Sequence, residues 1–123
     1  MRKTIRYRVY DRAADVPRSL EPELKRLTLP TGLMWGRYIS AWMRNRPGKV
    51  VIAFNGSHPV GWNLVDYKRV INQYVRKSWR GLGIGAMLLA TTAEEAGIKL
   101  TRKAVYSHMP DARKVLKRAR KKL

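Results

Sequence analysis

The chain has 123 residues and no cysteine, and its 27 Lys and Arg outweigh 8 Asp and Glu to give a formal net charge of +19. This length suits one domain with one core, while the lack of cysteine excludes disulfides, thiolate metal ligands and a thiol nucleophile. The only histidines, His58 and His108, are too few for a typical metal site, and no apolar run reaches the roughly 20 residues of a membrane span. Because Met1–Arg6 also lacks the apolar segment of a secretory signal, we expect a single domain over residues 1–123 in the cytoplasm, without metal and away from membranes.

The N-terminal part predicts one strand followed by two helices. Thr4–Tyr10 alternates polar and apolar residues, which indicates a half-buried strand. Pro17 suits a first helical turn, and three leucines then repeat at helical spacing: Leu20, Leu24 and Leu27. After a break at residues 28–32, Leu33–Asn45 carries one apolar face and predicts a second helix that ends before Pro47.

Three consecutive strands are predicted next. Lys49–Phe54 reads as a buried strand, and Asn55-Gly56 is a strong hairpin signal that joins it to Val60–Val65. A turn at residues 66–68 leads to a third strand, Val70–Val75.

The last third predicts helix, strand and helix. The first helix spans Gly83–Ala96, with Gly97 as its stop. A strand follows at Arg102–Ser107, and Pro110-Asp111 opens a helix that continues to the C-terminus. The order β-α-α-β-β-β-α-β-α combines an antiparallel meander with a βαβ crossover, and predicts a mixed α+β sheet (α/β mixed sheet) rather than a doubly wound fold.

The segment from Arg80 to Ala86 is the strongest motif, because three alternating glycines lead from a strand into a helix. Such a loop is typical of phosphate binding at a helix N-terminus. A Walker loop is excluded because Ile84-Gly85-Ala86 replaces its Gly-Lys-Ser/Thr ending. A dinucleotide fingerprint fits Gly81, Gly83 and Ala86 formally, but no acidic residue follows at the required distance and too little chain remains for a second βαβ unit.

The same residues resemble the GNAT acyltransferase superfamily, whose loop is Arg/Gln-x-x-Gly-x-Gly/Ala. Arg80, Gly83 and Gly85 match this motif, and the hairpin with Val60-Gly61 is similar to the family's central hairpin. The element order is also that of the family, so the resemblance covers roughly residues 3–118. It implies the acyl-CoA N-acyltransferase fold, in a shortened form in which the family's final strands are missing.

The resemblance implies acetyl-CoA as the cofactor. Amides around Leu82 to Ala86 would bind its pyrophosphate, the backbone of Val75 would pair with the pantetheine arm, and basic side chains would add charge contacts. The implied cofactor-binding residues are Val75, Arg76, Lys77, Arg80, Gly81, Leu82, Gly83, Ile84, Gly85 and Ala86. Three glycines at the start of a helix cost backbone conformational entropy. This cost favours the interpretation that a ligand approaches the backbone closely, and disfavours a glycine-rich loop that binds no ligand.

The catalytic residues of the family are less well matched. Its usual glutamate has no counterpart in Asn72-Gln73-Tyr74, and Leu116 falls where the family commonly has a tyrosine. Tyr106 and His108 are the substitutes, the first as general acid and the second as a base acting through water. The alternatives are that Tyr106 is an ordinary core or rim aromatic and that His108 is a surface or helix-entry residue.

The C-terminal helix, about residues 111–123, is strongly basic. Its expected inward stripe is Ala112, Val115, Leu116 and Ala119. The residues expected to bind nucleic acid or an acidic partner are Arg113, Lys114, Lys117, Arg118 and Lys121. Coenzyme A carries too few negative charges to account for +19. We therefore expect a nucleic-acid, ribonucleoprotein or acidic protein partner, with a merely solvated basic surface as the alternative.

Two functional hypotheses follow. The first is an N-acetyltransferase that moves the acetyl group of acetyl-CoA to an amine of a protein or nucleic-acid-associated acceptor. The second is a GNAT-fold module with weak or no catalysis, which binds nucleic acid or an acidic host protein through its basic surface. The intact glycine loop favours the first hypothesis, and the poor match at the catalytic positions favours the second.

Overall fold

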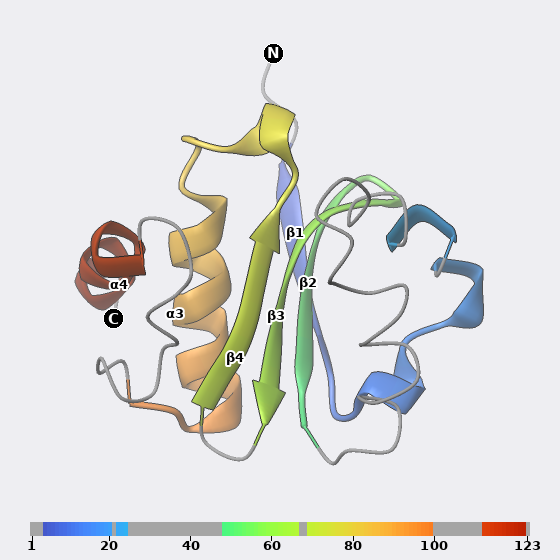
Figure 1. The fold of residues 1–123 in the computed structure, drawn as a ribbon, viewed down its shortest axis with the longest axis horizontal. Coiled ribbons are helices and arrows are strands. Elements are labelled where there is room, and N and C mark those ends of the chain that lie inside the picture. Colours follow the sequence, from blue (N-terminus) through green and yellow to red (C-terminus); the bar gives the residue numbers. More distant parts are fainter. Residues whose placement is uncertain (1–3, 21, 25–47, 67–68, 100–111, 123) are drawn as a thin grey trace.

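The computed structural model describes residues 4–20, 22–24, 48–66, 69–99 and 112–122, shown as coloured ribbon in Figure 1. Two helical predictions, the continuation to Leu27 and the helix Leu33–Asn45, lie outside these residues, as does the strand Arg102–Ser107. The βαβ crossover that depends on this strand therefore stays a prediction.

A four-stranded antiparallel sheet forms the centre of the described fold. Its strands β1 (Ile5–Tyr10), β2 (Val50–Asn55), β3 (His58–Asp66) and β4 (Arg69–Val75) lie side by side in chain order. All three neighbouring pairs are antiparallel. The predicted α+β class and the meander of three consecutive strands are thus confirmed.

The β2–β3 hairpin turns at the predicted site. Asn55 pairs with His58, and Gly56 between them has φ +61°, a left-handed conformation that glycine adopts without steric cost. The register shifts between Ala53 and Phe54, two residue pairs before the turn.

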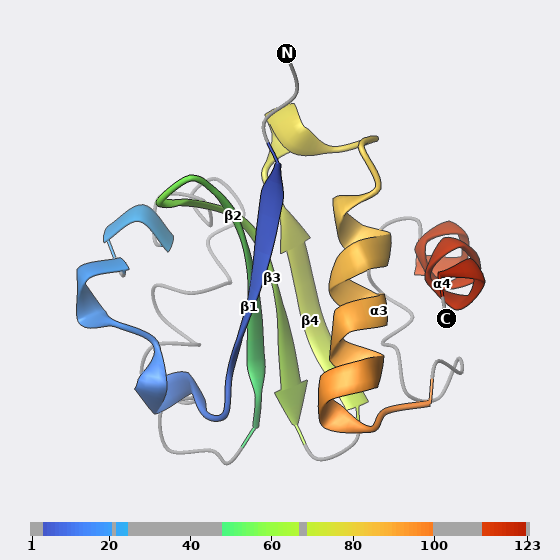
Figure 2. The same ribbon diagram turned by 180° about the vertical axis from the view of Figure 1, so that it is seen from behind.

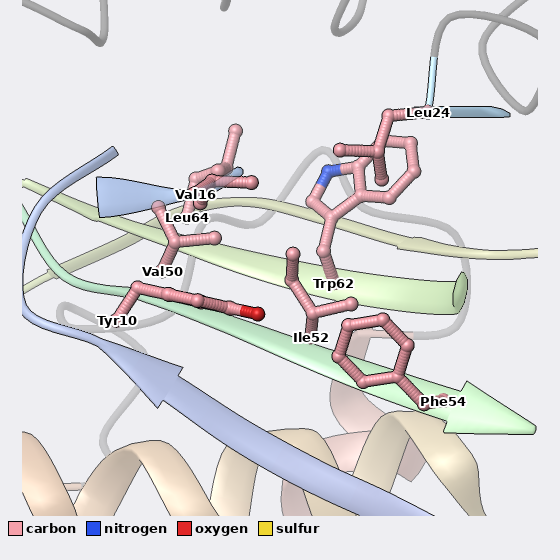
Figure 3. Packing of buried hydrophobic residues seen from close by; sticks show 8 residues of the cluster. All are labelled: Tyr10, Val16, Leu24, Val50, Ile52, Phe54, Trp62 and Leu64. Atoms are coloured by element: carbon pink, nitrogen blue, oxygen red, sulfur yellow. The ribbon is translucent and has the colours of Figure 1, made fainter. Parts of the chain in front are cut away.

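One face of the sheet packs against the N-terminal segment. A hydrophobic cluster lies on this face. Its strand residues alternate along the strands and contact Val16 and Leu24, which come from the segment that follows β1 (Figure 3). The cluster consists of Tyr10, Val16, Leu24, Val50, Ile52, Phe54, Trp62 and Leu64. Trp62 is its largest fully buried side chain, and its ring stacks on Tyr74 with the ring centroids 4.8 Å apart.

Between β1 and Leu24 the chain forms short helical turns rather than one continuous helix. They are η1 (Ala13–Asp15), η2 (Arg18–Leu20) and a helical segment at residues 22–24. The predicted helix after Pro17 thus differs at its start, where Arg18–Leu20 forms a 3-10 turn.

The opposite face of the sheet is covered by α3 (Ile84–Ala96), as Figure 2 shows from behind. Ile84 and Leu88 pack into the cluster formed with Val51, Ala53 and Val60. The helix ends at Gly97, whose φ of +65° gives the predicted left-handed C-terminal stop.

The last helix, α4 (Ala112–Lys121), packs on the outer side of α3 (Figures 1 and 2). Leu116 and Ala119 are buried against Ala86 and Leu89 of α3, and Val115 lies beside them half-buried. These three α4 residues confirm the predicted inward stripe. The fourth, Ala112, has no described side-chain environment.

Candidate functional site

The candidate site begins where β4 leaves the sheet. The N–H of Arg76 donates to the carbonyl of Val60 at 2.7 Å, so Val60 and Arg76 occupy a hydrogen-bonded position of the antiparallel ladder. Such positions alternate with non-bonded ones. Val75, opposite Gly61, is therefore a non-bonded position, and its N–H and C=O point away from β3 toward the outer edge of β4.

The turn η5 (Lys77–Trp79) follows directly. Arg76, Lys77 and Ser78 are exposed, whereas Trp79 is half-buried and packs against the cluster between the sheet and α3. Trp79 thus holds the turn on the fold while the preceding side chains project into solvent.

Arg80 lies back along the edge of β4. Its Nε donates to the carbonyl of Val75 at 2.8 Å, and its guanidinium carbon is 5.7 Å from the ring centroid of Tyr74. Since Tyr74 stacks on the buried Trp62, the core fixes the surface on which the guanidinium rests. Arg80 itself remains exposed.

Gly81 and Gly83 are required by backbone conformation. Their φ values are +80° and +82°, in the left-handed region that other residues rarely adopt. A Cβ on either would meet no atom within 4 Å, so space is not the reason for glycine here. Open space beside both residues leaves their backbone accessible to a ligand.

At position 85, glycine is required by close packing rather than by backbone conformation. A Cβ there would lie 3.0 Å from Gln73 Oε1 and 3.4 Å from Val115 Cγ1. The Cβ position of Gly85 thus faces its own protein, so close packing is a reason for glycine here, while the role of its backbone amide in ligand binding stays a prediction. This glycine lets α3 approach β4 and α4.

The first turn of α3 begins directly after the two loop glycines at positive φ. Gly83 is its N-cap, without a side-chain cap bond, and the Gly83 carbonyl accepts the N–H of Met87 at 3.1 Å. Amides of a first helical turn have no partner within the helix and carry the positive end of its dipole. Because Ile84 and Ala86 are buried, they can serve a ligand through backbone amides alone, beside Leu82, which is 44% exposed.

The loop between β4 and α3, residues 76–83, is positively charged. Its three cations, Arg76, Lys77 and Arg80, are all exposed. Among the residues that the structure describes, the ion pairs join Arg12 to Asp15, Lys49 to Asp11 and His58 to Glu23, and none involves the loop. An anion at the start of α3 would therefore meet cations that no described carboxylate neutralises.

A chain of polar side chains positions the start of α3 on the sheet. Gln73 Nε2 donates to Asn63 Oδ1 at 2.6 Å and to the carbonyl of Gly85 at 3.0 Å. Asn63 Nδ2 donates to Thr92 Oγ1 at 3.1 Å, and the Thr92 hydroxyl donates to the carbonyl of Leu88 at 2.6 Å. Asn63 and Thr92 are fully buried. The amide nitrogen of Gln73 thus helps to hold α3 on the sheet.

Sequence reasoning missed this positioning role. Gln73 and Val75 are two residues apart on β4 and therefore share a face, which the alternation does reveal. The partners Asn63 and Thr92 lie on other elements, and no local pattern pairs them.

The proposed catalytic pair cannot be placed, since Tyr106 and His108 lie outside the described residues. Leu116, which the motif resemblance aligns with a tyrosine, is buried between α3 and α4. Away from the loop, burial raises the pKa of Tyr7, and the hydrogen bond from Lys49 lowers the pKa of Asp11.

Of the predicted partner-binding residues, Lys114, Lys117, Arg118 and Lys121 are exposed on α4. Arg113 belongs to the same helix, but its side chain is not described.

No protein-family model, curated protein or solved structure matches this chain. Within the described part of the chain, no cluster of three or more His, Cys, Asp or Glu could hold a metal ion. In the same ranges, none of the helices has the length and apolar character needed to cross a membrane.

Proposed function

We propose that this protein is a GNAT-type N-acetyltransferase that uses acetyl-CoA to acetylate an amine of a protein or nucleic-acid-associated acceptor. One observation carries the proposal: a strand with an outward-facing backbone edge leads through Gly81 and Gly83, both at positive φ, into the N-terminus of α3. The motif residues Arg80, Gly83 and Gly85 match the family pattern at this junction.

The residues present fit coenzyme A. The amides of Gly83 to Ala86 would bind the pyrophosphate, with Arg76 and Lys77 adding charge. The pantetheine arm carries amides, and the outer edge of β4 offers the N–H and C=O of Val75 for them. Arg80 already donates to that carbonyl, which can accept a second hydrogen bond because it has two lone pairs.

Acetyl-CoA would supply the thioester whose acetyl group is transferred to the acceptor amine. The residues of the chain would orient the cofactor along β4, so that the acceptor meets the thioester in a fixed geometry. Gln73 contributes by fixing the first turn of α3 through its bond to Gly85.

Calorimetry with acetyl-CoA tests the proposal on two matched variants, Gly83→Glu and Gly56→Glu. Both replace an open glycine at positive φ and add the same charge, but Gly56 lies in the hairpin turn. We expect wild type and Gly56→Glu to bind with similar affinity, and Gly83→Glu to bind about tenfold more weakly or worse, since a carboxylate there repels phosphate. Absent binding by wild type, or equal affinities of the two variants, would refute the cofactor assignment.

The second candidate is a module that binds its partner without catalysis. The burial of Leu116 between α3 and α4, at the family's tyrosine position, favours it. Incubation with labelled acetyl-CoA and cell extract separates the two functions. Label on a protein or nucleic acid, lost in Gly83→Glu, supports the enzyme; acetyl-CoA binding without any labelled acceptor supports the module.

A further inference from the structure

We infer that the outer face of α4 binds the phosphate backbone of double-stranded DNA. The helix forms the outermost layer of the described fold, with α3 between it and the sheet (Figures 1 and 2). Its contact with α3 uses Val115, Leu116 and Ala119, which leaves the opposite side of the helix to solvent.

The exposed side is a stripe of cations. At about 100° per residue, Lys114, Lys117 and Lys121 lie opposite the buried stripe, with Arg118 next to them. All four are exposed. From Lys114 to Lys121 the stripe extends about 10 Å along the helix at 1.5 Å per residue.

Nothing within α4 neutralises this stripe. The helix contains no acidic residue, and like charges three or four residues apart destabilise it. The ion pairs recorded in the described ranges all lie on the other side of the molecule, around β1, η1 and the β2–β3 hairpin. A polyanion along α4 would remove this repulsion.

The side-chain chemistry favours duplex DNA over other anionic surfaces. The exposed stripe has no aromatic residue on which unpaired bases could stack and no large apolar residue for insertion into a membrane. A helix with its side chains is about 10–12 Å wide and fits the roughly 12 Å major groove of B-DNA, whereas the deep groove of duplex RNA is too narrow. Because lysine predominates, the contacts would be to phosphates rather than to base edges.

The test measures binding of a labelled DNA duplex of about 20 base pairs by fluorescence anisotropy, across about 50 to 200 mM NaCl. The α4 variant carries Lys114→Gln, Lys117→Gln and Lys121→Gln. A control removes the same charge from the far side of the sheet through Arg8→Gln, Arg12→Gln and Arg18→Gln, all exposed in wild type. Thermal unfolding followed by circular dichroism verifies that both variants are folded.

We expect the slope of log K against log[NaCl] to shrink by about 2.7 in the α4 variant, since each lost phosphate contact removes about 0.9. The control should keep the wild-type slope and lose only a few-fold in affinity. Equal losses in both variants, a flat salt response of wild type, or tighter binding to duplex RNA or polyglutamate than to DNA would overturn the inference.

This surface is independent of the proposed cofactor site. Gly83→Glu should retain DNA affinity without acetyl-CoA, and the α4 variant should retain acetyl-CoA affinity. A negative result for the cofactor site therefore does not contradict the DNA-binding proposal, and a negative result for DNA binding does not contradict the cofactor site.

Discussion

Gly61 shows how one residue allows two neighbouring strands, β3 and β4, to lie close together. A Cβ at this position would lie 2.8 Å from the carbonyl oxygen of Tyr74 and 3.4 Å from Leu88 Cδ1. The carbonyl belongs to the β4 backbone and cannot move aside as a flexible side chain would. The Val-Gly pair that resembles the family's hairpin thus has a packing reason in this chain.

We predict that Gly61→Ala lowers the free energy of unfolding by about 1–3 kcal/mol, the usual cost of forcing extra atoms into a packed interior. Urea denaturation of the variant measures it. Ser57→Ala, in the exposed hairpin turn, is the control and should change stability by less than about 0.5 kcal/mol. A stability loss no larger than that of the control would show that β3 and β4 are less closely packed here.

At the scale of elements, the buried polar chain of Asn63, Gln73 and Thr92 joins β3, β4 and α3. Thr92→Val removes the partner of Asn63 Nδ2, and an unsatisfied buried amide costs about 1–3 kcal/mol. Asn63→Leu should also be destabilising, because Thr92 Oγ1 loses its donor and Gln73 Nε2 loses one of its acceptors. In the double variant the two losses should not add, since both changes break the same hydrogen bond.

A double-mutant cycle by chemical denaturation measures this coupling. If the two losses simply add, the Asn63–Thr92 bond contributes nothing measurable. Acetyl-CoA affinity of the same variants gives a second readout, because a loosened α3 would misplace the amides of the loop.

The elements were predictable wherever a local signal sets them. Alternation predicted β1, Asn55-Gly56 predicted the hairpin, and Gly97 predicted the end of α3. The glycine loop was predictable for the same reason, because left-handed conformations at Gly81 and Gly83 need glycine.

Features that join distant segments were not predictable. The helical period of α4 predicts an apolar stripe, but the same stripe could cover a sheet or another helix, and the structure shows it on α3. The packing reason for glycine at position 85 was hidden as well, because its contacts, Gln73 and Val115, come from other elements. Arg80 likewise could not be placed on Tyr74 from sequence alone.

At the scale of the whole molecule, charge opposes compactness. The net charge is +19, so most cations of the chain have no acidic counterpart. Self-repulsion of this kind destabilises a compact state and weakens as salt shortens the Debye length from about 10 Å at 0.1 M to about 3 Å at 1 M. We predict that the melting temperature rises as NaCl is added over this range.

Thermal unfolding at several NaCl concentrations measures the effect. The variant with Lys114, Lys117 and Lys121 changed to Gln should melt higher at low salt and respond less to added salt. A melting temperature of wild type that falls with NaCl would show that attractive ion pairs outweigh the repulsion.

The position of α3 between two partners has a consequence for local opening. Ile84 and Leu88 bury one side of this helix against the sheet, while Ala86 and Leu89 bury another against α4. An element enclosed in this way exchanges its amide hydrogens mainly through global unfolding, whereas an exposed loop exchanges through local fluctuations. This enclosed helix follows directly after two glycines, Gly81 and Gly83, whose Cβ positions face open space. A ligand on the loop should therefore slow amide exchange at residues 80–83 while exchange within the body of α3 changes little.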